Sequence, residues 1–148
     1  MTINEVISLV DKYRPGNRFD NDLKTQWIYE VDSAIFDEYI NPKALLRRKP
    51  PRLTDAIDPL NLGNRPHIRY KRHGLGPYRY ETDGDENTIL PDRFSDVYVQ
   101  YIKAKMDAED GETDEYNNSV VLYQSAMDEF SGWFIRNYGS SATQGFIF

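Results

Sequence analysis

A long apolar seam in the last third of the chain constrains the fold more than any other feature. Large apolar residues recur there at alternating intervals of four and three, at Tyr116, Val120, Tyr123, Met127, Phe130 and Phe134. This spacing is typical of a long helix that packs along one face. A second apolar face runs from Phe94 to Met106, and Asp110-Gly111 separates it from the seam. Because a turn of about three residues makes two helices antiparallel, the sequence predicts an αα-hairpin over residues 92–138.

The first 40 residues predict two further helices. Thr2 and Glu5 match a capping box, in which each side chain satisfies a free backbone N–H group of the other residue. Apolar residues follow at helical spacing, at Ile3, Val6, Ile7, Val10 and Tyr13. Pro15-Gly16 ends this helix, and Asp20 is an N-cap candidate for the next one. The apolar positions of the second helix are Leu23, Trp27, Val31, Ala34, Ile35 and Tyr39, before Asn41-Pro42 closes it.

Residues 41–91 interrupt this helical pattern. They contain most of the prolines and show no sustained helical period. Residues 67–71 and 78–82 alternate aromatic with cationic or polar side chains around a glycine-containing loop, which predicts a β-hairpin. About fifty residues without a long helix exceed an ordinary connection. We therefore interpret this segment as a basic arm inserted in a single domain of 148 residues.

Charge is distributed unevenly along the chain. Residues 41–80 hold ten Lys and Arg against two Asp, a net charge of +8, whereas the other residues carry −14. This asymmetry predicts that the arm contacts nucleic acid, or an acidic face of its own helices or of another copy. The candidate contact residues of the arm are nine of these ten cations, all except Lys43: Arg47, Arg48, Lys49, Arg52, Arg65, Arg69, Lys71, Arg72 and Arg79. The candidate acidic partner surface, which we call the acidic cluster, is Asp107, Glu109, Asp110, Glu112, Asp114 and Glu115.

The last nine residues form a short tail with an apolar end. Exposed chain ends are usually polar, whereas this one finishes in Phe146-Ile147-Phe148. The tail either packs on its own core or inserts into another subunit, by strand addition or into a groove. The candidate anchoring residues are Ser140, Ser141, Gln144, Gly145, Phe146, Ile147 and Phe148.

Catalytic signatures are missing from the sequence. There is no cysteine, and the two histidines, His67 and His73, lie in the basic arm without metal-ligand spacing. The acids between Asp107 and Glu115 flank a helix start, where they favour the positive end of the helix. We expect neither an enzyme nor a cofactor. No run approaches the roughly 20 apolar residues of a membrane helix, and the charged N-terminus does not resemble a signal peptide.

Two stretches resemble a family of phage head–tail connector proteins from siphophages of Gram-positive hosts. Residues 1–40 match its opening, with a short helix, an Arg-Pro turn and a Trp-containing helix. Residues 89–138 match its second half through Leu90-Pro91, Phe94, Asp96-Val97-Tyr98, Tyr116-Asn117-Asn118, Tyr123, Ala126, Glu129-Phe130 and Trp133. Residues 41–88 depart from the shorter, more acidic connection of that family.

The resemblance implies a mainly α protein that forms a ring beneath the portal, commonly of twelve copies. Such a ring extends the DNA channel, carries the next neck component (a stopper or tail terminator), and holds the portal through an extended C-terminal arm, where the tail stands here. Genomic DNA would pass through without sequence-specific contacts. The expected location is the virion neck, and the host cytoplasm during assembly. The alternative, drawn from the basic arm itself, is a nucleic-acid-associated accessory or regulatory protein.

Overall fold

The computed structural model describes residues 1–40, 70–71, 74–75 and 77–138. Its α-helices are α1 (Ile3–Tyr13), α2 (Asn21–Ile35), α4 (Tyr80–Asp83), α5 (Ser95–Asp110) and α6 (Thr113–Tyr138). A π-helical turn, Phe36–Ile40, continues α2, and a 3-10 turn, Asp92–Phe94, leads into α5. The expectation of a mainly helical protein is confirmed.

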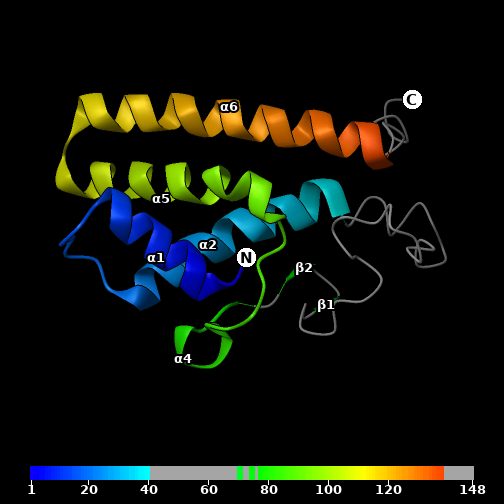
Figure 1. Cartoon of the computed structure of the whole chain (residues 1–148), viewed down its shortest axis with the longest axis horizontal. Helices are drawn as coiled ribbons and strands as arrows, with labels where there is room; N and C mark the ends of the chain where they lie inside the picture. Colours follow the sequence, from blue (N-terminus) through cyan, green and yellow to red (C-terminus); the bar gives the residue numbers. More distant parts are fainter. Residues whose placement is uncertain (41–69, 72–73, 76, 139–148) are drawn as a thin grey trace.

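The long helices lie in three layers, with α5 in the middle (Figure 1). On one side α5 packs antiparallel against α6, and on the other side it contacts α1 and α2. Its inward positions are accordingly buried, among them Val97, Tyr98, Ile102 and Met106. This arrangement makes α5 the centre of the hydrophobic core, because each layer buries its apolar face against it.

The start of α1 forms as the sequence predicts. Thr2 accepts a hydrogen bond from the Glu5 N–H group and donates its own N–H to the Glu5 carboxylate, which completes the capping box. The next free donors of the helix, the N–H groups of Ile3 and Asn4, bond to carbonyl groups of residues 86 and 84. The first turn of α1 therefore fastens the segment that follows α4. Of the predicted apolar positions only Tyr13 is exposed, at 59%.

The seam of α6 is buried unevenly. Phe130 and Phe134 are fully buried and meet the ring of Tyr39 at 5.2 Å each, and Phe94 also packs edge-on against Phe130. Toward the start of α6, Tyr116 remains 38% exposed. The reason is that the π-helical turn and Phe94 cover only the second half of the helix, whereas the first half rests on α5.

The turn between α5 and α6 follows the predicted αα-hairpin. Gly111 adopts φ +73°, the left-handed conformation that glycine reaches without the usual steric cost. The Glu112 N–H group then bonds to the Asp107 carbonyl and closes the end of α5.

The predicted β-hairpin is wrong in its second strand. Residues 80–83 form helix α4, because the Gly84 N–H bonds to the Tyr80 carbonyl and the Asp83 carboxylate accepts the Arg79 N–H. Two strands of two residues each, β1 (Tyr70–Lys71) and β2 (Gly74–Leu75), pair antiparallel instead. Residues 41–69 of the expected arm and the tail 139–148 lie outside the described residues.

Candidate functional site

A buried carboxylate organises the region where residues 77–90 meet the helical layers. Asp32 is fully buried on α2 and accepts hydrogen bonds from the Tyr78 hydroxyl (2.7 Å) and the Ile89 N–H group (3.2 Å). The hydroxyl of Tyr98, on α5, also donates to Asp32 and accepts the Leu90 N–H at 3.0 Å. Burial, together with the neighbouring Asp32 carboxylate, raises the pKa of Tyr98 well above its usual value, so its hydroxyl keeps its proton.

The Asp32 network was not predicted from the sequence. A signal was nevertheless present, because Asp32 lies four residues after Ile28 and three before Ile35, both of which are buried. Those intervals place a carboxylate on the inward face of a helix, where it requires hydrogen-bond donors. Only the folded structure shows that the donors come from residues 78, 89 and 98.

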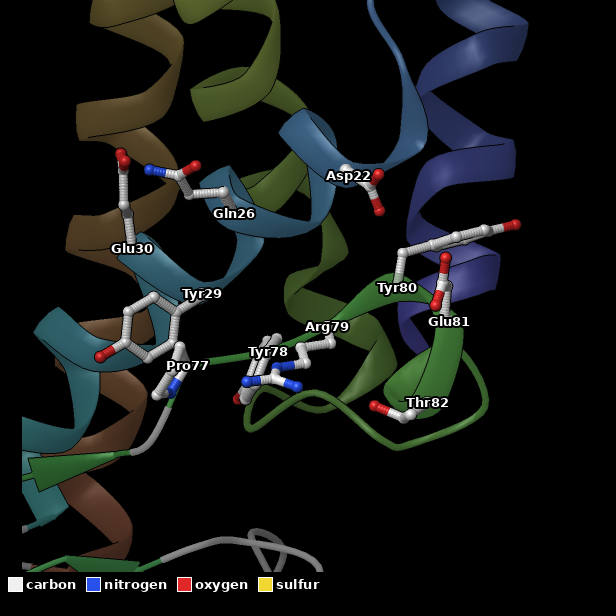
Figure 2. A pocket seen from close by; sticks show the side chains of 10 residues that line it. All are labelled: Asp22, Gln26, Tyr29, Glu30, Pro77, Tyr78, Arg79, Tyr80, Glu81 and Thr82. Atoms are coloured by element: carbon white, nitrogen blue, oxygen red, sulfur yellow. The ribbon is translucent and has the colours of Figure 1, made fainter.

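Tyr78 of this network also lines a groove between α2 and the segment that includes α4 (Figure 2). It has a volume of about 510 Å³. Helix α2 contributes Asp22, Gln26, Tyr29 and Glu30 to its lining, and residues 77–82 form the other wall. We call this site the α2–α4 groove.

Aromatic rings and carboxylates dominate the α2–α4 groove. The rings of Tyr29 and Tyr78 meet edge to face at 5.4 Å, and Tyr80 stands on the α4 side. Asp22 and Glu81 are exposed at its rim, and the exposed Arg79 is the cation that residues 77–82 contribute. Within the part of the chain that the structure describes, neither Asp22 nor Glu81 forms an ion pair.

Glu30 lies at the end of the groove nearest α5, and residues of that helix hold its carboxylate in place. It accepts a hydrogen bond of 2.5 Å from the Tyr101 hydroxyl and lies 3.6 Å from the Lys105 ammonium group. Burial and the Glu30 carboxylate raise the pKa of Tyr101, so that this hydroxyl also remains a donor. The Glu30 carboxylate is thus fixed by α5, whereas those of Asp22 and Glu81 are not.

The acidic cluster is partly occupied by cations of the same chain. Asp107 is buried, and it accepts hydrogen bonds from the Arg14 guanidinium (3.0 and 3.1 Å) and the Ser119 hydroxyl (3.2 Å). Asp110 pairs with Arg18 at 2.9 Å. Asp107 is therefore part of the interior rather than of an exposed partner surface.

The other members of the acidic cluster differ in their surroundings. Glu115 lies 4.0 Å from the Arg14 guanidinium. Glu109, Glu112 and Asp114 are exposed. The loop between α1 and α2 carries Arg14 and Arg18. These two residues thus neutralise much of the acidic cluster, which the sequence predicts to contact the basic arm.

Among the other predicted site residues, the structure describes Arg79 and the backbone of Lys71. Arg79 is exposed in the α2–α4 groove, and the backbone of Lys71 belongs to β1. The remaining cations of the basic arm and all seven anchoring residues of the tail lie outside the described residues, as do both histidines.

The described residues contain neither a cluster of metal-ligating side chains nor a helix that could span a membrane. Over residues 1–40 and 77–138, no three Asp, Glu, His or Cys side chains converge as they would around a metal ion. None of the described helices is long and apolar enough to cross a membrane. A comparison of the chain with protein-family models, curated proteins and solved structures found no match.

Proposed function

We propose that this chain is a structural head–tail connector of a tailed-phage neck, which assembles as a ring under the portal and extends the DNA channel. One observation carries the proposal. The two stretches that resemble the connector family, residues 1–40 and 89–138, are separated by about fifty residues, yet they pack into one helical body through α5. If the two stretches resembled the family only by unrelated local similarity, nothing would require them to pack into the same core.

The shape and surface of that body suit a ring subunit. A closed ring uses two different faces of each subunit, one for each neighbour. Helix α6 forms an outer layer and exposes large apolar side chains, including Val121 at 62%, Leu122 at 40% and Ile135 at 40%. Apolar side chains along one outer helix favour contact with another protein surface.

In this proposal the tail holds the portal, and the basic arm contacts a neighbouring subunit or faces the DNA in the channel. The apolar residues Phe146, Ile147 and Phe148 would supply the anchoring contact, since their burial removes large apolar surface from water. The ring would act at the virion neck after assembly in the host cytoplasm.

Co-sedimentation with a purified portal tests the function. We expect the intact chain to sediment with the portal, and a chain truncated after Gly139 to lose that binding. A full-length variant with Phe146→Ser, Ile147→Ser and Phe148→Ser is the matched control, because it keeps the tail length while removing the apolar contacts. We expect it to lose binding as the truncated chain does.

Failure of the intact chain to sediment with the portal would contradict the connector function. The nucleic-acid alternative would then be tested by a gel-shift titration, in which a regulatory protein shifts a DNA probe with a steep dependence on salt.

A further inference from the structure

The α2–α4 groove has two unpaired carboxylates beside aromatic rings. Asp22 and Glu81 are exposed and lack an ion-pair partner among the described residues, and Tyr29, Tyr78 and Tyr80 line the same groove. Tyrosine faces attract cations, and carboxylates form short, charge-assisted hydrogen bonds with guanidinium and ammonium groups. The chemistry of the lining therefore fits lysine and arginine side chains.

Two residues of the groove lining are held in place by contacts with other parts of the chain. The hydroxyl of Tyr78 is fixed by Asp32, which is fully buried, and Glu30 is fixed by Tyr101 and Lys105. A binding surface that is already ordered loses less conformational entropy on association. Its volume of about 510 Å³ is within the range in which several side chains can be accommodated.

The chain itself contains a segment of matching charge. Residues 41–52 carry Lys43, Arg47, Arg48, Lys49 and Arg52 and no acidic residue. We propose that the α2–α4 groove receives this cationic segment from a neighbouring copy of the chain. The inference rests on the proposed ring, and it names the contact that joins one subunit to the next.

Ion pairs within the chain favour the α2–α4 groove over the paired members of the acidic cluster as the receiving surface. In the cluster, Arg14 and Arg18 already meet Asp107, Asp110 and Glu115. A basic segment that bound there would have to compete with two guanidinium groups of the receiving subunit. In the groove, Asp22 and Glu81 form no ion pair with any described residue, although Arg79 also belongs to the lining.

The distance along the chain excludes one contact, that between Asp22 and Lys43, within a single subunit. Asp22 and Ile40 are 18 positions apart along α2 and the π-helical turn, or about 27 Å at the rise of a helix. Lys43 follows Ile40 by three residues, which span at most about 10 Å when fully extended. The ammonium group of Lys43 therefore cannot reach the Asp22 carboxylate of the same chain.

The first test uses a labelled peptide of residues 41–53 and the intact chain, followed by fluorescence anisotropy. We expect binding, and we expect the double variant Asp22→Asn and Glu81→Gln to weaken it roughly tenfold, because two charge-assisted contacts are lost. The matched control, Glu109→Gln with Glu112→Gln, removes the same charge from the acidic cluster and should change binding by less than about twofold. Absence of peptide binding, or an equal loss in both double variants, would overturn the inference.

The second test identifies the donor of the segment. Equal amounts of ¹⁴N-labelled and ¹⁵N-labelled chain are assembled, and a zero-length carbodiimide reagent joins carboxylates to amines. We expect cross-links of mixed isotope between Lys43 or Lys49 and Asp22 or Glu81. Cross-links from these lysines that join one isotope only, or that end in the acidic cluster, would overturn the proposed neighbour contact.

These outcomes are separable from the connector function itself. If the intact chain sediments with the portal but binds no peptide, the α2–α4 groove is wrong and the connector function stands. If the intact chain does not sediment with the portal, the connector function fails, and the peptide titration still decides whether the groove binds the cationic segment.

Discussion

At the scale of residues, the ion pair of Asp11 and Lys24 shows that burial makes the loss of one partner cost more stability than the loss of the other. The Lys24 ammonium group donates to Asp11 at 2.8 Å, but the Lys24 side chain is only 4% exposed and that of Asp11 is 45% exposed. Asn17 also donates to the same Asp11 oxygen at 2.9 Å. Removing the acid leaves a buried charge unpaired, whereas removing the base leaves a carboxylate that water can reach.

We therefore expect Asp11→Ala to lower the free energy of unfolding by about 2–3 kcal/mol at neutral pH. Lys24→Met keeps the apolar stem of the side chain and should cost less than about 1 kcal/mol. Urea unfolding of both variants measures the difference. Equal costs, or a larger cost for Lys24→Met, would contradict this account of the pair.

The pair also predicts the pH dependence of stability. Burial acts to raise the pKa of Asp11, but the hydrogen bonds from Lys24 and Asn17 and the charge of Lys24 hold it below its usual value of 3.8. Because the folded chain has the lower pKa, the stabilising effect is complete above pH 3.8 and is lost as the pH falls through the folded value. The destabilisation caused by Asp11→Ala should accordingly shrink below that pH.

At the scale of elements, two glycines in the αα-hairpin have opposite roles. Gly111 ends α5 at φ +73°, and an added Cβ would meet no atom within 4 Å, so a substitution there is costly only through backbone conformation. Gly132 lies inside α6, where an added Cβ would approach the movable Nη1 atom of Arg136 at 3.3 Å.

Gly111→Ala should therefore destabilise the fold by about 1 kcal/mol, since alanine is strained in the left-handed region. Gly132→Ala should stabilise it by roughly 0.5–1 kcal/mol through its higher helix propensity. Urea unfolding midpoints of the two variants test this contrast. A loss of stability in Gly132→Ala as large as in Gly111→Ala would show that Arg136 cannot move aside.

At the scale of the whole molecule, the layered arrangement leaves one long helix with a single main neighbour. Helix α6 packs on α5, and Val121 and Ile135, which are close to four helical turns apart and so lie near one side of the helix, are exposed. If this side forms the contact between ring subunits, Val121→Lys with Ile135→Lys should abolish assembly on the portal while the fold remains intact. Both side chains are already exposed, so their replacement costs little within the subunit.

Sedimentation velocity of portal complexes measures that effect, with circular dichroism to verify folding. Ser8→Lys with Asn87→Lys, both at exposed positions outside α6, controls for the two added positive charges. Normal rings from the α6 variant would exclude this helix face from the subunit interface.

The amino-acid sequence by itself determined the positions of the long helices and their ends. The capping box at Thr2, the N-cap at Asp20 and the glycine at 111 all act over a few residues, so their effect does not depend on the rest of the fold. The apolar periods likewise fixed which helix faces turn inward.

Only the tertiary structure decided which polar groups meet across the layers. Residues 78–82 alternate as a strand would, yet residues 80–83 turn into a helix that lies against α2 and leads to the start of α1. Asp32 finds partners 46 to 66 positions away in the sequence, and Asp107 turns inward to Arg14 across 93 positions. Local patterns cannot specify such pairs, because the free energy that stabilises them comes from groups that are brought together only when the core closes.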